Sequence, residues 1–202
     1  VALDARIILH DSNLHEGQLP RLAIRPYPHQ HASTGTLADG TPVVIRPIRP
    51  EDEPLMVKFH EALSDRSVYY RYFAPLSLEQ RIAHPRLARI CFVDYDREIA
   101  LVAIHAGPTY GQREILGVGR LCRKRGKNEG KFALVVSDRW QNRGLGTRLL
   151  KMLVNIGRDE GIDRITGAIL PDNPEMRHIC ERGGFRIQTS ADHTECEAEI
   201  RL

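Results

Sequence analysis

Two glycines that follow a short apolar run give the clearest chemical signal in this sequence. The run Phe132–Val136 leads into the polar stretch Ser137–Arg143, after which Gly144 and Gly146 open a long amphipathic pattern. This order predicts a strand, a loop and a helix. Glycines let a ligand approach the backbone closely, and the first turn of a helix offers free N–H groups and a positive dipole end. The loop is therefore predicted to bind a diphosphate. Three nearby arginines add positive charge: Arg139, Arg143 and Arg148.

Two common phosphate-binding patterns do not fit the residues around these glycines. A P-loop needs a Lys-Ser/Thr pair after its last glycine, whereas Gly146 is followed by Thr147 and Arg148. The dinucleotide fingerprint needs a third glycine, which is missing here and also after Gly117-Val118-Gly119. The pattern that remains is Gln-x-x-Gly-x-Gly, which starts at Gln141 and comes directly after the predicted strand.

With this loop the sequence resembles the GNAT superfamily of N-acetyltransferases, whose members use it to bind the pyrophosphate of acetyl-coenzyme A. A second stretch matches as well: Asn173 and Pro174 begin a predicted helix, and Gly184-Phe185 follow about one helix later. In the superfamily an Asn at this helix start contacts the coenzyme. An ordinary turn between a buried strand and a helix is the alternative for the loop alone. Two matches in the right order favour acetyl-coenzyme A, with no metal.

The resemblance implies an α/β GNAT fold with a central mixed, mostly antiparallel, splayed sheet flanked by helices. In this fold the backbone of the strand before the loop pairs with the pantetheine arm of the coenzyme, and that role falls on Leu134, Val135 and Val136. The other residues expected to contact the coenzyme are Gln141, Asn142, Arg143, Gly144, Leu145, Gly146, Thr147, Arg148 and Asn173.

The chemistry implied is acyl transfer from a thioester to an amine. The amine must lose a proton, and the oxyanion of the tetrahedral intermediate needs preorganised donors. A backbone N–H near Val135 is the expected donor. The sequence also resembles lysine acetyltransferases linked to a synthetase-like region, which carry a catalytic glutamate where this chain has Lys131. Three alternatives follow. Glu129, on the same face of the strand, replaces that base; water carries the proton away; or transfer is lost and the domain only senses acetyl-coenzyme A. Cys180 stands where many relatives have a Tyr that protonates the leaving thiolate.

The first 32 residues carry a second resemblance. Asp4-Ala5-Arg6 and Ile24-Arg25-Pro26-Tyr27-Pro28 are similar to the end of the ATP-grasp region of ADP-forming acyl-coenzyme A synthetases. A flexible arm is the alternative. In one bacterial group of protein lysine acetyltransferases a GNAT domain follows such a region. Because the sequence begins at Val1, we expect a fragment in which residues 1–32 are that tail and residues 33–202 form the GNAT domain.

Composition limits the remaining possibilities. A chain of 202 residues with 42% hydrophobic content can bury one main core. The net charge of +3 is far from that of a dedicated nucleic-acid binder, and the basic run 120–127 has no interleaved aromatic residues. No apolar run approaches the roughly 18 residues of a membrane span. The cysteines lack a C-x-x-C pair, so we expect reduced core residues in a cytoplasmic protein; they are Cys91, Cys122, Cys180 and Cys196.

Local patterns predict the other elements. Asp39-Gly40 between β-prone runs predicts a hairpin, and acidic residues after Pro50 predict the start of a helix. The core face of that helix is expected to hold Leu55, Phe59, Ala62 and Leu63. Further helices are predicted at 64–73 and 77–90, and further strands at 3–9, 90–94, 99–105, 115–122, 164–170 and 195–202.

Taken together, these patterns predict an enzyme that acetylates lysine side chains of proteins such as acyl-coenzyme A synthetases. Its expected partners are a protein with an exposed lysine and the synthetase-like region, with no nucleic acid or membrane. The alternatives are a non-catalytic acetyl-coenzyme A sensor and a small-molecule amine acetyltransferase.

Overall fold

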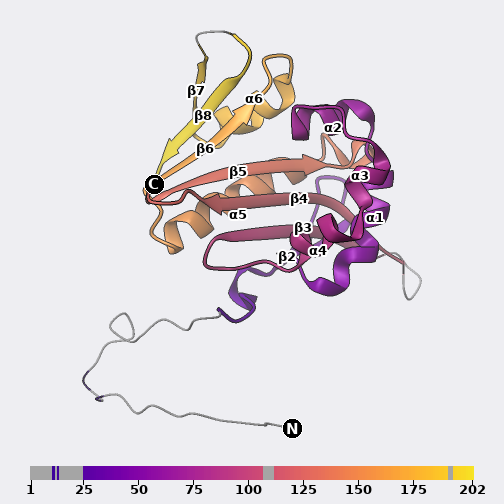
Figure 1. Ribbon diagram of the computed structural model, residues 1–202, viewed down its shortest axis with the longest axis horizontal. Coiled ribbons are helices and arrows are strands. Elements are labelled where there is room, and N and C mark those ends of the chain that lie inside the picture. The colour runs from indigo at the N-terminus through magenta and orange to yellow at the C-terminus, as the bar shows by residue number, and fades with distance from the viewer. Residues whose placement is uncertain (1–10, 12, 14–24, 107–111, 191–192) are drawn as a thin grey trace.

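The computed structural model describes residues 11, 13, 25–106, 112–190 and 193–202 (Figure 1). The strand predicted at 3–9 lies outside this part of the chain.

One open, mixed sheet forms the centre of the described structure. Its order is β1-β2-β3-β4-β5-β6-β8-β7, and every neighbouring pair is antiparallel except β5 and β6, which are parallel. This is the mixed, mostly antiparallel sheet that the resemblance to the GNAT superfamily implies. The strands are β1 (Ser33–Thr36), β2 (Pro42–Pro47), β3 (Glu98–Ala106), β4 (Arg113–Arg123), β5 (Glu129–Val136), β6 (Arg164–Ile169), β7 (Arg186–Thr189) and β8 (Cys196–Arg201).

Helices cover both faces of the sheet. One face carries α1 (Glu53–Glu61), α2 (Asp65–Tyr72), α3 (Leu78–Ile82) and α4 (His84–Cys91), which gather at one end of the strands in Figure 1. The other face carries α5 (Leu145–Asp159) and α6 (Pro174–Arg182). Each layer has its own core: Leu149 and Leu153 belong to the cluster under α5, and Phe59 and Leu87 to the cluster under α1 and α4. Short 3-10 turns span His29–His31, Pro50–Asp52 and Asp138–Trp140.

The helices begin where the sequence places their capping residues. Ser64 Oγ accepts a hydrogen bond from Ser67 N at 3.2 Å at the start of α2. Asn173 Oδ1 accepts one from Met176 N at 3.0 Å before α6, where Pro174 takes the first helical position. Both caps satisfy an N–H group that the helix itself leaves free.

The parallel pair β5 and β6 separates after a few residues. Their pairing covers Glu129–Arg164, Gly130–Ile165 and Lys131–Thr166, and no further pair follows. The strands diverge beyond this point (Figure 1). The ring of Phe132 fills part of the gap: it lies over Gly167, where a Cβ atom would collide with it, and packs edge-on against Phe185 at 5.3 Å. The predicted splay of the sheet is present, and the ring of Phe132 lies at its closed end.

The structure differs from the local predictions at three places. Residues 90–94 were expected to form a strand, but α4 runs to Cys91, because Leu87 and Cys91 are buried one helical turn apart. The strand β7 was missed, since none of its residues is fully buried and it shows no alternating apolar signal. On α1, Ala62 is exposed, whereas Met56 and His60 are buried.

The segment just before the sheet packs on the domain. Tyr27 donates its hydroxyl to Pro47 O at 2.7 Å, and its ring meets Tyr95 edge-on at 6.2 Å. Arg25 forms ion pairs with Glu160 at 2.8 Å and Asp96 at 3.2 Å. Residues 25–31 therefore do not behave as the free arm that was one expectation for this region.

A buried ion pair fixes the turn from β2 into α1, and removing half of it is expected to destabilise the fold. Arg46 contacts both carboxylate oxygens of Asp52 at 2.7 Å, and Arg49 N donates to the same carboxylate at 2.8 Å. The side chain of Arg46 is 14% exposed and that of Asp52 is 4% exposed. Asp52→Asn should lower the free energy of unfolding by about 3 kcal/mol, because it leaves a buried guanidinium charge unpaired.

Urea unfolding measures this effect, and Arg97→Gln is the control, since Arg97 and its partner Asp94 are 71% and 59% exposed. The control should change stability by less than about 1 kcal/mol. Equal losses in the two variants would contradict a special role for the Arg46–Asp52 pair.

Candidate active site

A cavity of about 540 Å³ opens where β5 and β6 diverge. Its walls come from β5, β6, α2, α6 and the loop after β5. Seven of the residues predicted to contact the coenzyme line it: Leu134, Val135, Val136, Gln141, Asn142, Gly146 and Asn173. The fold thus brings together two stretches that the sequence separates by about one helix and one strand.

Along this cavity, β5 has a free backbone edge. Ser137 N donates to Leu116 O and Lys124 N donates to Glu129 O, so odd-numbered residues of β5 direct their backbone groups to β4. Alternation then directs the N–H and C=O groups of Leu134 and Val136 to the opposite edge, from which β6 has diverged. Val135 itself is bonded toward β4, so the donor expected near it belongs to a neighbouring residue. Such an edge can pair with an extended amide-containing ligand as an added strand would.

The first turn of α5 closes one end of this arrangement. Gly144 has φ of +80°, a left-handed conformation that disfavours side chains, and nothing lies within 4 Å of where its Cβ would be. Arg148 N donates to Gly144 O, and no acceptor among the described residues takes the N–H groups of Leu145, Gly146 or Thr147. These groups and the helix dipole suit an anion such as a diphosphate.

Hydrogen bonds to α2 hold the loop in place. The carboxylate of Asp138 accepts from Ser64 Oγ at 2.6 Å, Ser64 N at 2.9 Å and Ser67 Oγ at 2.9 Å. Burial alone would raise the pKa of Asp138, but these bonds from Ser64 and Ser67 bring it below its ordinary value. Gln141 Nε2 donates to Ser67 Oγ at 3.1 Å and to Val136 O at 3.0 Å. The glutamine of the motif is therefore a clamp between loop, strand and helix.

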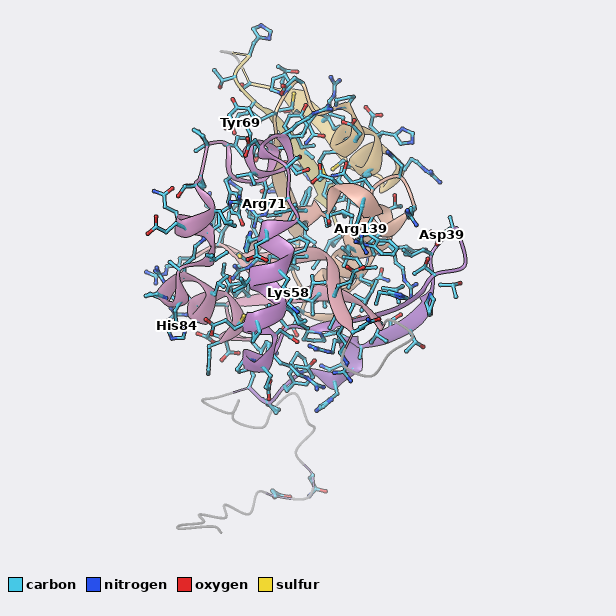
Figure 2. All side chains as sticks on the ribbon, turned by 90° about the vertical axis from the view of Figure 1, so that its right-hand side faces the viewer. Asp39, Lys58, Tyr69, Arg71, His84 and Arg139 are labelled. Carbon is cyan, nitrogen blue, oxygen red and sulfur yellow. The ribbon has the colours of Figure 1, made fainter. Side chains whose placement is uncertain are left out.

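The arginines predicted around the loop have partners outside the cavity. Arg139 pairs with Glu114 at 2.7 Å, Arg143 pairs with Asp39, and Arg148 donates to Ser33 Oγ and Thr34 O at 3.0 and 2.9 Å. Arg139 and Asp39 lie on the same side of the molecule in Figure 2. The Arg143–Asp39 pair is 39% and 36% exposed, so exchanging it for a phosphate costs little. Leu145 is buried in the core, and it offers only its backbone to a ligand.

Glu129, the predicted substitute base, lies outside the cavity lining. Although β5 does extend to this residue, its carboxylate accepts hydrogen bonds from Arg164 at 2.7 Å and Lys124 at 3.1 Å. The bond from Lys124 is the main reason that the pKa of Glu129 is lowered, and Arg164 adds to it. The structure therefore places Glu129 in an ion-pair network at the closed end of the splay. Lys131, two residues further on, does line the cavity.

Cys180 does not reach the cavity either. It is fully buried in α6, and burial raises the pKa of its thiol to about 12. This agrees with its expected place in the core and gives it no path to a leaving thiolate.

A second cavity, of about 450 Å³, lies on the α1–α4 face of the sheet. It shares Arg71, Tyr72 and Val135 with the first cavity, so the two meet at the middle of β5. Glu98 of β3 supplies a carboxylate, and it stands in one cross-strand row with Cys122 and Lys131. No local pattern in the sequence predicts this site, because six separate elements build it: α1, α2, α4, β3, β4 and β5. Arg71 lies near the centre of this side of the molecule, between Tyr69 and Lys58 (Figure 2).

Proteins of similar sequence are acetyltransferases. The model of the acetyltransferase (GNAT) domain family matches residues 43–186, so the chain belongs to this family of acetyltransferases. An acetyltransferase of Pseudomonas aeruginosa is 28% identical over 159 residues, which cover 78% of this chain and 82% of that protein.

Solved structures agree with the family. The GNAT domain of S. lividans PAT matches with a TM-score of 0.76 and 28% identity, over 88% of this chain and all of that one. Mycobacterium smegmatis RimJ, solved in complex with CoA-disulfide, matches with a TM-score of 0.65 and 16% identity over 85% and 87% of the two chains. The PaiA N-acetyltransferase of Thermoplasma acidophilum, solved with coenzyme A, matches with a TM-score of 0.61 and 15% identity, over 79% of this chain and 99% of that one.

The residues of the first cavity fit acetyl-coenzyme A as the co-substrate of this family. The free edge of β5 suits the amides of the pantetheine arm, and the first turn of α5 suits the pyrophosphate. Among the described residues, no group of three or more His, Cys, Asp or Glu side chains could hold a metal ion. None of the helices in the described ranges is long and apolar enough to cross a membrane.

Adding a methyl group at Gly144 is expected to weaken coenzyme binding. Gly144→Ala strains the left-handed backbone that leads into the first turn of α5 and puts a methyl group into the open space there, so the dissociation constant for acetyl-coenzyme A should rise about tenfold or more. Isothermal titration calorimetry measures it. Gly126→Ala is the matched control, because Gly126 also has positive φ with open space around it but lies in the β4–β5 turn. Both variants should lose about 1 kcal/mol of stability, and an equal affinity in both would contradict the predicted diphosphate site.

A buried histidine beside the second cavity makes stability depend on pH. His60 is 1% exposed, and burial, followed by the charges of Arg81, Arg86 and Arg71, lowers its pKa from 6.5 to about 4. The unfolded chain therefore binds a proton as pH falls below 6.5, while the folded chain does not until about pH 4. The stability due to neutral His60 is complete above pH 6.5 and is lost toward pH 4, by up to about 3 kcal/mol.

Urea unfolding of wild type and His60→Leu from pH 7 to pH 4 measures this loss. The decline should be shallower in the variant, which lacks the titrating ring. Parallel curves for the two proteins would show that other groups cause the acid sensitivity.

Proposed function

We propose that this chain transfers the acetyl group of acetyl-coenzyme A directly to a lysine side chain of a protein, and that acyl-coenzyme A synthetases are among its substrates. The observation that supports transfer is the free edge of β5, which runs along a cavity from the middle of the sheet to the first turn of α5. One surface can therefore bind the arm and the diphosphate of the donor while a second cavity admits an acceptor to the same part of β5.

In the transfer step, the acceptor nitrogen forms a bond to the thioester carbonyl carbon, and the carbon–sulfur bond then breaks. The developing oxyanion needs a donor that is in place beforehand, and the N–H groups of Leu134 and Val136 on the free edge are the candidates. The thiolate that leaves takes a proton from solvent, because Cys180 is buried away from the cavity.

The acceptor amine loses its proton to water in this proposal. Glu129 is already bonded to Arg164 and Lys124 and does not line either cavity. Positive charge near the amine does part of a base's work, since it lowers the pKa of an ammonium group. Lys131 and the arginines of the second cavity supply that charge.

The proposal that the acceptor is a protein rests on the resemblance to synthetase-linked lysine acetyltransferases and on the similarity to the GNAT domain of S. lividans PAT. A synthetase-like region joined to this domain would then be its partner in the same polypeptide, in the cytoplasm. A sensor that binds acetyl-coenzyme A without transfer is the second candidate, and Lys131 in the position of the expected glutamate is the observation that favours it. A small-molecule amine acetyltransferase is the third.

Binding and turnover separate these functions. Calorimetry should detect acetyl-coenzyme A binding, and release of free thiol in the presence of lysine peptides should detect transfer. Removing a general base usually lowers kcat about a hundredfold or more. Because Glu129 is not the base in this proposal, we expect Glu129→Gln to keep nearly the wild-type kcat. Glu199→Gln is the matched control, since Glu199 also pairs with Arg164, at 2.9 Å.

A large loss of kcat in Glu129→Gln alone would identify Glu129 as the base. Transfer that appears only in Lys131→Glu would identify a sensor, and an absence of acetyl-coenzyme A binding would end the proposal.

A further inference from the structure

Arginine side chains dominate the second cavity. Arg71 comes from α2, Arg86 and Arg89 from α4, and Arg120 from β4. Glu98 is the acidic residue of the lining, and it is paired with Arg120 and accepts a hydrogen bond from Cys122. Four guanidinium groups therefore face one carboxylate, and the cavity carries an excess of positive charge.

Several of its donors are buried without an acceptor. Among the described residues, nothing accepts from Arg86 Nε or Arg120 Nε, and both ring nitrogens of His60 are equally without a partner. His60 is 1% exposed. Buried donors of this kind are rare in folded proteins, because each costs about 1–3 kcal/mol when it is left unsatisfied. Such a group of donors indicates a site whose acceptor atoms come from a ligand.

The ring of Tyr72 holds two of the arginines at the cavity. The guanidinium carbons of Arg71 and Arg86 each lie 5.1 Å from its centroid, within the range of a cation–π contact. Neither guanidinium forms an ion pair in the described structure. Burial, together with the charges of Arg120 and Arg86, lowers the pKa of Arg71. The fold thus maintains positive charges close together, at a cost that a bound anion would offset.

We propose that the acceptor of this enzyme is a primary amine whose carrier also bears a carboxylate, and that Arg71, Arg86 and Arg120 bind that carboxylate. The inference rests on the proposed transfer function and adds the chemical class of the acceptor. A planar guanidinium matches the two oxygens of a carboxylate, so arginine suits this task better than lysine.

The second cavity lies close enough to β5 for a carboxylate bound there to belong to the same molecule as the reacting amine. Because Arg71, Tyr72 and Val135 line both cavities, an acceptor anchored among the arginines can present its amine at the middle of β5. The carboxylate draws the acceptor into a cavity that would otherwise repel an ammonium group. The arginines then favour the neutral amine, which is the form that attacks. The diphosphate of the coenzyme has its own site at α5 and does not account for these arginines.

Two chemically matched pairs of acceptors test the proposal. Free lysine and cadaverine differ in one carboxylate, and two lysine peptides that differ in one Asp→Asn change test an acidic side chain near the acceptor. The carboxylated member of at least one pair should have a kcat/KM about tenfold or more higher, the usual contribution of hydrogen bonds to a charged group. A preference in the first pair identifies a small amine, and a preference in the second identifies a protein.

Arg86→Gln should reduce this preference to about threefold or less, whereas Arg86→Lys, which keeps the charge but loses the fork, should give an intermediate value. Calorimetric binding of acetyl-coenzyme A shows that each variant is folded. Arg125→Gln is the control. Arg125 is exposed in the β4–β5 turn, so this substitution removes the same charge far from the cavity. It should keep the full preference.

The outcomes separate this inference from the proposed function. Equal kcat/KM values within both pairs would overturn the carboxylate site and leave the transferase intact. If no amine is acetylated although the coenzyme binds, the transferase is overturned, and binding of Nε-acetyl-lysine against N-acetylcadaverine decides the carboxylate site. Tighter binding of the carboxylated compound that is lost in Arg86→Gln would support it, and equal binding would overturn it.

Discussion

The separation of β5 from β6 is the feature on which the rest of the site depends. A central strand normally has both backbone edges paired, and an unpaired edge in the interior costs free energy. Here the two strands pair over three residues and then diverge, and the ring of Phe132 occupies the narrow end of the gap. The open backbone edge that carries the N–H groups of Leu134 and Val136, the cavity beside it and the approach to α5 all follow from that divergence. A regular sheet with the same residues would have no room for a coenzyme.

The loop after β5 is fixed from the opposite face of the sheet. Ser64 and Ser67 of α2 hold Asp138, and Gln141 connects Ser67 to Val136. The helix that borders the second cavity is therefore hydrogen-bonded to the loop that precedes the first turn of α5. This connection gives a structural reason for the motif glutamine that does not require it to touch the ligand.

The distribution of charge departs from what a carboxylate base would need. Lys131 lines one cavity, four arginines line the other, and Glu129 is committed to ion pairs elsewhere. In the proposed reaction, this positive charge binds an amine that brings its own anion and favours loss of the ammonium proton. The positive charge and the proposed loss of the amine proton to water then belong to one arrangement. The buried, neutral His60 fits the same arrangement, because a further positive charge beside these arginines would be costly.

The sequence by itself determined the elements whose signals are local. The strand before the loop, the cap at Asn173 and the hairpin at Asp39-Gly40 each depend on a few adjacent residues, and the structure contains all of them. The resemblance to the GNAT superfamily, carried by two short motifs, also predicted seven of the residues that line the first cavity. Only the tertiary structure decided where long side chains go. Arg143 and Arg148 find acceptors on β1 and its hairpin, Glu129 meets Arg164 across a strand pair, and four arginines from α2, α4 and β4 converge on one cavity. Their positions depend on partners far away in the chain, and a long, flexible charged side chain carries no local record of which partner it will reach.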